Sequence, residues 1–328
     1  MNHSEWSIDV INSSHQADVS RLFERVFAKP LSPALWTWKY ADGRGYSLGL
    51  YKRGQGLLGH YGSTIRTLLI RGKSRKGLQI CDVMVDVRAR GVFSLNGPFA
   101  RLTAKFIDSY IANSPSKTIG FGFPSDRHLR LGSLLQHYTP VASMMEVSFN
   151  RSQCQIISGS PWIALKVDWA NDITRTEIER LWLLMAADLA GSNVAERSYD
   201  WWRHRYANHP SGVYQAFWLK TRLNDQIMGV FVLSINAQFS SSELLDWIAS
   251  TDVTLELVAT AVQTAVGLNA GTVKLWCSEP VATHISDLID HRDQVCSASV
   301  TTATLTSLSG KEEILGNWWL TGGDTDFR

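Results

Sequence analysis

The stretch CDVMVDVRARGVFSLNGPF, from Cys81 to Phe99, is the part of the sequence that decides the fold. Its first residues are rich in valine, as β-strands are. A basic turn with a glycine follows at Arg88–Gly91, and apolar residues at helical spacing begin near Asn96. A helix N-terminus offers N–H groups, glycine lets the backbone approach an anion, and arginine adds charge. The stretch therefore predicts a phosphate-binding turn, although an ordinary strand-to-helix turn with solvated arginines has the same pattern.

Strands and helices alternate on both sides of this stretch in the first half of the chain. Apolar residues recur with period two or period 3.6, and Gly/Pro turns separate the runs. The expected strands cover 7–11, 46–51, 57 onward, 78–87, 117–123 and 141–149, and the expected helices cover 14–28, 33–40, 96–112 and 126–136.

The second half of the chain repeats the first in outline. Trp36–Ala41, which reads WTWKYA, parallels Trp202–Ala207, which reads WRHRYA. In each half an aromatic strand, a polar turn and an apolar-apolar-Gly strand start follow, and the next strand carries Asp82 or Asp246. A Ser/Gln-rich linker is expected at 151–160. We therefore predict one domain at 1–150 and a divergent copy at 161–328.

Composition narrows the class of protein. The 328 residues are 45% apolar and 19% charged, which suits a folded chain and excludes a disordered one. A net charge of +2, without a Lys/Arg-dense arm, gives no indication of a nucleic-acid partner. Apolar runs are short, so no membrane span is expected. Four scattered cysteines without a CxxC pair favour a reducing, cytoplasmic location and no metal site.

The order of elements and the central stretch resemble the GNAT acyltransferase superfamily. That family has an acyl-CoA signature, V-x-P-x-x-R-G, which runs from a strand into a long helix. Val85, Val87 (where proline is usual), Arg90 and Gly91 take its positions without a gap, and the family's second glycine falls on Phe93. The resemblance implies an α/β fold with two GNAT-like domains in tandem. Each would have a central mixed, mostly antiparallel sheet flanked by helices, and the second copy would be degenerate.

The resemblance also implies where acyl-CoA, with acetyl-CoA as the expected co-substrate, would bind. In the family, the strand that ends at Val85–Val87 pairs by its backbone with the pantetheine arm. The turn Arg88–Ser94 and the following helix start hold the pyrophosphate. The cofactor-binding residues expected on this basis are Met84, Val85, Val87, Arg88, Arg90, Gly91, Val92, Phe93, Ser94 and Gly97.

Asp82 is the residue best suited to acid–base chemistry. Strict strand alternation would place its side chain on the face opposite Cys81 and Val85. Partial burial would raise its pKa, so the carboxylate could take a proton from a substrate ammonium, directly or through water. A structural role, in which Asp82 hydrogen-bonds nearby backbone, is the alternative. Asp246 in the second copy favours that alternative.

Other residues acquire roles through the resemblance. In the family a tyrosine of the following helix protonates the leaving thiolate; its position falls near Gly132 here, so Tyr138, six residues on, is the candidate general acid. The substrate-binding candidates are Trp36 and Tyr40, on a helix that borders the acceptor site in the family, and Phe121 and Phe123, at a strand end rich in Gly and Pro. Core packing is the alternative for these four aromatic side chains.

The leading hypothesis is an acyl-CoA-dependent acyltransferase of the N-acetyltransferase type. It would move acetyl by direct attack to a small-molecule amine or amino-sugar acceptor. The second copy is not expected to bind CoA, because Asp252 and Glu256 at its helix start would repel a pyrophosphate. Two alternatives stay open. One is an aminoacyl-tRNA-dependent transferase of the peptidoglycan-bridge type, and the other is a non-catalytic CoA- or ligand-binding module of GNAT fold.

Overall fold

The computed structural model of the chain describes residues 6–89, 97–114, 118–149, 160–236, 241–302 and 311–328. The chain divides into two compact units. Unit 1 comprises Met1–Leu68, Ser74–Val141 and Ser297–Leu315, and unit 2 comprises Leu69–Lys73, Ala142–Cys296 and Gly316–Arg328. Each unit is a mixed sheet with helices packed against it, and each is described here by itself.

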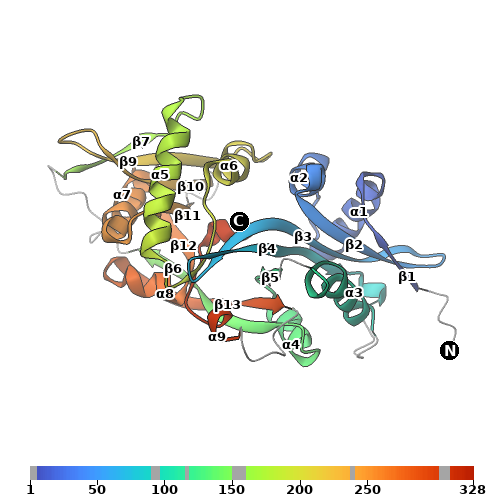
Figure 1. Cartoon of the computed structure of the whole chain (residues 1–328). Coiled ribbons are helices and arrows are strands. Elements are labelled where there is room, and N and C mark those ends of the chain that lie inside the picture. Colours follow the sequence, from blue (N-terminus) through green and yellow to red (C-terminus); the bar gives the residue numbers. More distant parts are fainter. Residues whose placement is uncertain (1–5, 90–96, 115–117, 150–159, 237–240, 303–310) are drawn as a thin grey trace. The chain divides into compact units, whose positions relative to one another are not determined.

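The sheet of unit 1 has the strand order β1, β2, β3, β4, β5 and the end of β13 (Figure 1). These strands are β1 (Trp6–Val10), β2 (Gly45–Lys52), β3 (Gly56–Ile70), β4 (Lys73–Val85), β5 (Ile119–Gly122) and β13 (Ile289–Thr302). The β1–β2, β2–β3 and β5–β13 pairs are antiparallel, whereas β4 and β5 are parallel. The β2–β3 hairpin turns at Gly54 and Gly56, whose positive φ angles of 76° and 73° favour glycine.

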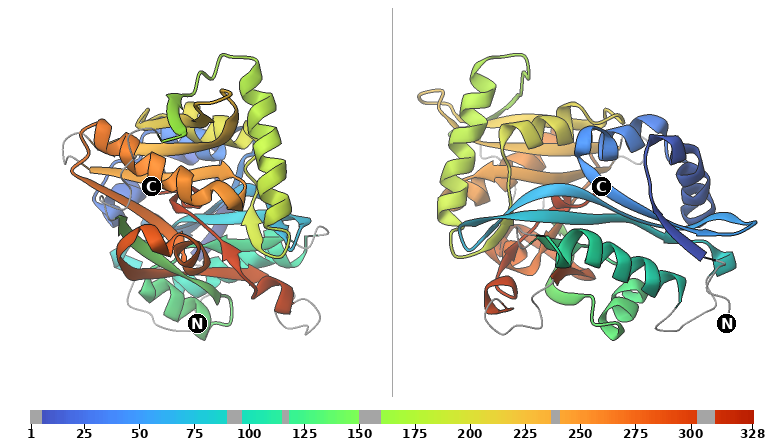
Figure 2. Two further views of the ribbon diagram at one scale, coloured as in Figure 1. Left: turned by 90° about the vertical axis from the view of Figure 1, so that its left-hand side faces the viewer. Right: turned by 45° about the vertical axis from the view of Figure 1, so that its right-hand side comes forward.

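Helices cover both faces of this sheet (Figure 2). On one face, α1 (Gln16–Phe27) and α2 (Pro33–Tyr40) bury Leu22 and Trp36 in a cluster with Met84 of β4. On the other face, α3 (Pro98–Ile107) buries Phe106 in a cluster with Tyr61 of β3. The remaining helices of unit 1 are α4 (Asp126–Leu134) and α9 (Lys311–Ile314).

The sheet of unit 2 has the strand order β6, β12, β11, β10, β9, β7, and β8 pairs with β14. The strands are β6 (Thr139–Phe149), β7 (Trp162–Lys166), β8 (Asn193–Ala195), β9 (Tyr214–Thr221), β10 (Ile227–Asn236), β11 (Ser241–Ala249), β12 (Thr272–Ser278) and β14 (Trp318–Trp319). The helices are α5 (Ile173–Asp188), α6 (Tyr199–Trp202), α7 (Thr254–Gly267) and α8 (Glu279–His284). Both α5 and α7 pack on β10 and β11.

The two units do not coincide with the two halves of the sequence, 1–150 and 161–328. In unit 1, Val300 of β13 pairs with Phe121 of β5. In unit 2, Met145 of β6 pairs with Cys277 of β12. Each sheet therefore contains a strand segment from the other half of the chain. The choice of partner for a strand depends on residues far along the chain, so the apolar pattern of the strand does not reveal it.

The expected elements of the first half match the structure closely in type. The helix expected at 33–40 is α2, which Ser32 caps by accepting a hydrogen bond from the N–H of Leu35. The strand expected at 78–87 ends at Val85, because Val87–Ala89 forms a turn of 3₁₀-helix. The fold is thus the mixed α/β arrangement that the sequence predicts. Within the described residues, every helix is too short or too polar to cross a membrane.

Candidate active site

The parallel strands β4 and β5 separate after a short contact. Pairing joins Gly77–Gln79 of β4 to Ile119–Phe121 of β5. Beyond it β4 continues to Val85, whereas β5 ends at Gly122. At Gly122 the two strands are still close, since a Cβ there would lie 3.1 Å from the carbonyl oxygen of Ile80 on β4. The end of β4 thus runs on beyond β5, toward the turn that resembles the acyl-CoA signature.

Asp82 lies three residues beyond the last parallel pair and is held by two residues of α2. Lys39 Nζ donates a hydrogen bond to Asp82 Oδ1 at 2.8 Å, and the Tyr40 hydroxyl donates to Asp82 Oδ2 at 2.6 Å. The side chains of Lys39 and Asp82 are each 4% exposed. The three residues form a buried, charged network between α2 and β4.

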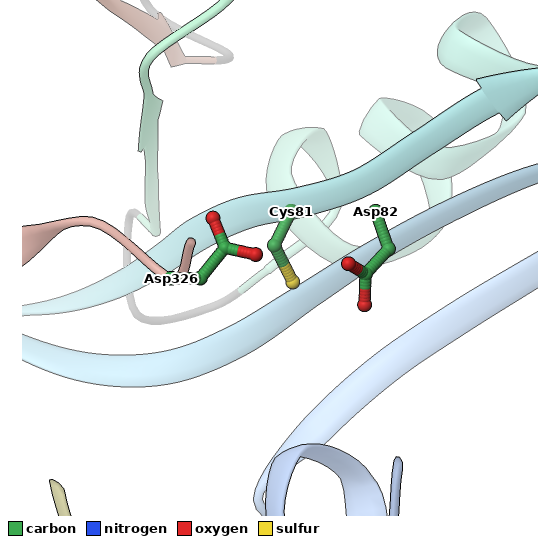
Figure 3. Close-up of side chains that lie close together, drawn as sticks. All are labelled: Cys81, Asp82 and Asp326. Carbon is green, nitrogen blue, oxygen red and sulfur yellow. The ribbon is translucent and has the colours of Figure 1, made fainter. Parts of the chain in front are cut away.

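The backbone at Asp82 departs from a regular strand. Its φ of +48° is left-handed, a conformation that aspartate tolerates better than most residues. Cys81 and Asp82 consequently point to the same side of β4 (Figure 3), and the Tyr40 hydroxyl lies 3.4 Å from Cys81 Sγ while it bonds Asp82. The prediction that Cys81 and Asp82 occupy opposite faces is wrong, because the left-handed residue interrupts the alternation.

The main-chain carbonyl of Asp82 has its own buried partner. His60 Nδ1 lies 2.7 Å from this carbonyl oxygen, and His60 Nε2 lies 2.6 Å from Ser47 Oγ. Burial lowers the pKa of His60, which keeps the ring neutral. A neutral ring fits the two contacts if Nδ1 donates to the carbonyl and Nε2 accepts from the Ser47 hydroxyl. This contact helps to fix the unusual backbone at Asp82.

The charge of Asp82 depends on its cationic partner. Burial alone would raise the pKa of Asp82, but the Lys39 ammonium and the hydrogen bonds from Lys39 and Tyr40 outweigh it and hold that pKa below its usual value. The prediction that burial raises this pKa is therefore wrong, because it did not include Lys39. Burial, followed by the charge of Asp82, raises the pKa of Tyr40 well above its usual value, so its hydroxyl stays protonated.

Asp86 engages the first arginine of the predicted anion-binding turn. Arg88 donates from Nε and Nη2 to the two carboxylate oxygens at 3.0 and 2.7 Å, and its backbone N–H donates to Asp86 Oδ1 at 3.0 Å. Arg25 Nε adds a bond of 2.8 Å. These donors, Arg88 first, lower the pKa of Asp86. Arg88 was expected to bind pyrophosphate, but in this structure its N–H and two of its guanidinium nitrogens already bond the chain's own carboxylate.

The rest of the predicted cofactor site is described only in part. Arg90, Gly91, Val92, Phe93 and Ser94 lie outside the described residues. Gly97 caps α3, Pro98 occupies the first helical position, and the first turn of α3 carries no acidic residue. In α7 of unit 2, by contrast, Glu256 lies in the first turn. Of these two helix starts, that of α3 is therefore the one that favours an anion.

The side chains at the end of β4 point in different directions. Met84 is buried in the cluster beneath α1 and α2, so only its main chain could contact a cofactor. Val85 is partly exposed, and Val87, which follows the strand, is 72% exposed.

The four aromatic substrate-binding candidates also differ in their surroundings. Trp36 is buried in the cluster beneath α1 and α2, and Phe121 is buried on β5. Phe123 follows β5 and is partly buried. Tyr40 is the candidate that contacts the Asp82 carboxylate directly. The structure therefore brings Tyr40 to the site and gives Trp36 and Phe121 core surroundings.

Tyr138, the candidate acid, is buried on the α3 side of the sheet. Its hydroxyl lies 2.7 Å from the hydroxyl of Tyr61, whose ring packs beside Phe106 of α3. Burial raises the pKa of Tyr138 to about 12. The ring of Tyr138 covers Gly132 of α4 so closely that a Cβ at Gly132 would overlap it. Tyr138 and Asp82 thus lie on opposite faces of the sheet in unit 1.

Three residues were not among the predicted site residues: Lys39 and His60, which contact Asp82, and Tyr61, which contacts Tyr138. One signal could have found Lys39. It stands between Trp38 and Tyr40 on a short aromatic helix, and a lysine that is buried almost always has a carboxylate partner.

Unit 2 repeats the arrangement of Asp82. β11 and β12 pair in parallel at Ser241–Glu243 and Thr272–Lys274, and Asp246 lies three residues beyond the last pair, as Asp82 does in unit 1. The hydroxyl of Tyr206, the counterpart of Tyr40, donates to Asp246 Oδ2 at 3.1 Å. Arg197 Nε supplies the cation, at 2.9 Å from Asp246 Oδ1. The repeat found in the sequence therefore has a counterpart in the geometry.

Comparisons with known proteins agree with this architecture. Residues 7–129 match the family model described as an acetyltransferase (GNAT) domain. A search of curated proteins finds no match. Among solved structures, the chain is similar to a probable N-acyltransferase from Enterococcus faecalis V583, with a TM-score of 0.67, 13% identity, and 92% of this chain and 73% of that chain covered.

Two further structures have the same fold. A GCN5-related N-acetyltransferase from Kribbella flavida has a TM-score of 0.60 and 16% identity, with 92% of this chain and 72% of that chain covered. The N-myristoyltransferase of Saccharomyces cerevisiae, solved with bound myristoyl-CoA, has a TM-score of 0.57 and 11% identity, with 92% and 83% covered. At these identities the likeness is one of fold, while the family match supports acyl transfer as the class of reaction. Residues 7–129 therefore match the GNAT acetyltransferase domain, and the chain has the fold of the solved GNAT acyltransferases to which it is similar.

Proposed function

We propose that the chain is an acyl-CoA-dependent N-acyltransferase, which moves acetyl from acetyl-CoA to an amine of a small molecule or amino sugar at a site in unit 1. The observation that carries the proposal is the separation of β4 from β5 beside the network of Lys39, Tyr40 and Asp82. Both strands fall within the part of the chain that matches the GNAT domain. A structure of the same fold was solved with bound myristoyl-CoA, which supports an acyl-CoA as the donor.

In this proposal, the end of β4 and the start of α3 receive acyl-CoA. The end of β4, at Val85, is the position where the family resemblance places the pantetheine arm. The start of α3, with Gly97 as its cap and no acidic residue in its first turn, favours the negatively charged pyrophosphate. Arg90 adds positive charge to the same turn of the sequence.

The proposed reaction is direct attack of the amine nitrogen on the thioester carbonyl. The acceptor ammonium first loses one proton to water, which exposes the lone pair of its nitrogen. A C–N bond then forms, the C–S bond breaks, the nitrogen loses a second proton and the thiolate gains one. The Asp82 carboxylate attracts and orients the acceptor ammonium. It has about four lone-pair positions, of which Lys39 and Tyr40 occupy two. Since Lys39 lowers the pKa of Asp82, the carboxylate is a weak base, and we assign the final acceptance of the proton to water.

Tyr138 is proposed to stabilise the leaving thiolate from the opposite face of the sheet. With its pKa raised to about 12, its hydroxyl stays protonated at neutral pH. In the pair of hydroxyls formed with Tyr61, one hydrogen bridges the two oxygens and the other can be donated to a further acceptor. An acid this weak stabilises a thiolate by a hydrogen bond, and solvent supplies the proton itself.

The first experiment tests cofactor binding by isothermal titration calorimetry with acetyl-CoA. Wild type should bind, and Arg90→Glu should bind more weakly because it reverses a charge at the pyrophosphate turn. Arg53→Glu, in the exposed turn between β2 and β3, is the matched control and should bind like wild type. No heat of binding for wild type at millimolar acetyl-CoA would overturn the proposal. Binding of tRNA without binding of CoA would instead support an aminoacyl-tRNA-dependent transferase.

The second experiment measures release of free CoA thiol across a panel of amines and amino sugars. Asp82→Asn should lower kcat/KM by roughly 10²-fold, which is the scale for misplacing a bound reactant, because the charge that orients the acceptor is lost, while the Kd for acetyl-CoA stays near wild type. A folded Asp82→Asn chain with full turnover would assign Asp82 a purely structural role. Acetyl-CoA binding without turnover on any amine would favour a non-catalytic binding module.

A further inference from the structure

The strands β11 and β12 of unit 2 are paired in parallel over only part of their length. Their parallel pairing ends at Glu243 and Lys274, after which β11 runs on to Ala249 and β12 runs on to Ser278. Two parallel strands that separate leave the facing main-chain groups of both without a partner in the sheet. Buried main-chain groups of this kind need other partners.

A segment from far along the chain, residues 318–325, takes the edge of β12 that β11 leaves. Thr321 forms an antiparallel bridge with Cys277. The N–H of Ser278 donates to the carbonyl of Leu320 at 2.9 Å, and the Ser278 hydroxyl donates to the carbonyl of Trp318 at 2.6 Å. The other edge of β12 pairs with Met144–Ser148 of β6 over the same length, so the segment lies on the side where β11 departs.

The segment also reaches β11. The Thr321 hydroxyl donates to Asp246 Oδ1 at 2.9 Å. Gly323 packs directly on Asp246, since a Cβ at Gly323 would lie 2.8 Å from Asp246 Cγ. A Cβ at Gly322 would lie 3.4 Å from Leu245 Cδ2. The close approach at Gly323 requires glycine, because a Cβ would overlap Asp246, whereas the contact of Gly322 with Leu245 is of ordinary van der Waals length. The segment therefore spans the gap between the separated strands.

A buried arginine fastens the segment to the unit. Arg197 donates from Nε to Asp246 and from Nη2 to Asp324 Oδ2, each at 2.9 Å, and all three side chains are 0% exposed. Asp324 also accepts from the N–H of Thr321 at 3.0 Å. A buried cation between two carboxylates is stable only while every member is in place.

We infer that segment 318–325 permanently fills the gap between the unpaired ends of β11 and β12, which we name the unit 2 cleft. In unit 2 it stands where the proposed function places the pantetheine arm of acyl-CoA in unit 1, next to the counterpart of Asp82. The chain therefore binds one acyl-CoA, in unit 1. The acidic Asp252 and Glu256 at the start of α7 agree with this assignment, because they disfavour a pyrophosphate there. The stoichiometry rests on the proposed function, whereas the occupancy of the unit 2 cleft does not.

The experiment is hydrogen–deuterium exchange of the full chain, with and without acetyl-CoA, together with native mass spectrometry. We expect peptides that contain 318–325 and 275–278 to be protected in the CoA-free protein and unchanged by acetyl-CoA. Peptides that contain the end of β4 should gain protection, with one acetyl-CoA per chain. Rapid exchange of 318–325, a change at 275–278 on adding acetyl-CoA, or two molecules per chain would overturn the inference. If acetyl-CoA does not bind at all, the proposed function fails, and protection of 318–325 still tests the occupant.

A pair of variants tests whether the protection of 318–325 depends on its contacts with Arg197 or on the stability of the whole unit. Asp324→Asn removes one of the two carboxylates on Arg197, and Asp287→Asn removes an exposed carboxylate of the same unit. Losing a charged hydrogen bond should lower the protection of 318–325 by roughly tenfold or more in Asp324→Asn. Protection in Asp287→Asn should equal that of wild type, and both variants should keep the wild-type Kd for acetyl-CoA. Equal protection of 318–325 in both variants would contradict the inference.

Discussion

Lys39 Nζ lies 2.8 Å from Asp82 Oδ1, and both side chains are 4% exposed. The bond joins α2 to β4 across 43 residues of sequence. Each charge is out of water only because the other is present, since an isolated buried charge costs several kcal/mol. The same pair anchors the fold of unit 1 and sets the charge at its candidate site, so a variant of either residue has to be tested for stability as well as for activity.

The first prediction concerns the stability of this pair. Asp82→Asn and Lys39→Met should each lower the free energy of unfolding by about 3–5 kcal/mol, because each leaves a buried charge unpaired. The double variant should lose less than the sum of the two, since it removes both charges together. Urea unfolding of the four proteins at pH 7 measures the three differences and the coupling between them.

The matched control is Asp42→Asn in the same unit. Asp42 pairs with Arg44, and these side chains are 76% and 44% exposed. An exposed pair of this kind contributes about 0–1 kcal/mol, so the control should stay within that range of wild type. Single variants of Lys39 or Asp82 that cost no more than Asp42→Asn would show that the pair does not stabilise the fold.

The second prediction concerns acid unfolding and Asp86. Arg88 and Arg25 lower the folded-state pKa of Asp86, so its stabilising contribution is complete above the unfolded pKa of about 4 and is lost as pH falls further. Asp86→Asn should therefore be less stable than wild type at pH 7, and the difference should shrink below about pH 4. Urea midpoints from pH 2.5 to pH 7 measure it. A stability difference that stays constant over this pH range would show that Asp86 does not contribute to acid unfolding.

The sequence predicts the fold of unit 1 well where the signals are local. The helix 33–40 follows from Ser32 and Pro33 at its start, and the structure places α2 at the same residues. Asp82 stands out because it is a carboxylate in a valine-rich strand. The repeat of WTWKYA as WRHRYA relates Tyr40 to Tyr206, and the structure gives both tyrosines an aspartate partner.

What the sequence does not predict depends on contacts between distant residues. Lys39 meets Asp82 across 43 positions, so the pKa of that aspartate could not be foreseen from burial alone. Arg88 looks like an anion-binding residue until Asp86 is seen to bond it. The pairing of Val300 with β5 is equally non-local. No periodicity within a strand encodes which distant strand it will join.

The third prediction concerns Glu243, whose folded-state pKa burial raises from 4.5 to about 6. When the folded-state pKa of an acid is raised, the folded state becomes more stable as pH falls through that pKa. Above pH 6 the buried charge of Glu243 costs about 2 kcal/mol, because one pKa unit corresponds to about 1.36 kcal/mol. Glu243→Gln removes this titration. The stability of wild type relative to Glu243→Gln should therefore fall by about 2 kcal/mol between pH 4.5 and pH 7.

The test is the change with pH in the stability difference between wild type and Glu243→Gln, and not the size of that difference at one pH. Glu243→Gln keeps an oxygen that can accept from Arg328, but its amide differs from the protonated acid, which shifts the stability by a constant amount at every pH. Glu279→Gln, an exposed position in the same unit, is the control and should follow wild type throughout. Urea unfolding at half-unit pH steps distinguishes the two variants. Parallel curves for wild type and Glu243→Gln would be the contrary result.

The fourth prediction concerns the packing of Tyr138 on α4. Alanine normally stabilises a helix interior relative to glycine by about 1 kcal/mol. At Gly132 the sign should reverse, because a Cβ there would overlap the Tyr138 ring and disturb its hydroxyl contact with Tyr61. Gly132→Ala should therefore lower the free energy of unfolding by about 1–3 kcal/mol. Thermal and urea unfolding both measure it, and Gly191→Ala, where a Cβ meets nothing within 4 Å, should be nearly neutral.

A second background isolates the cause of this reversal. In a Tyr138→Ala chain the ring is absent, so adding Gly132→Ala should no longer be destabilising and should recover the helix preference for alanine. Tyr138→Phe keeps the ring and removes only the hydroxyl, so in that background Gly132→Ala should remain destabilising. If Gly132→Ala has the same effect with and without the ring, overlap with Tyr138 is not the reason for glycine at this position, and the close packing of Tyr138 on α4 loses its support.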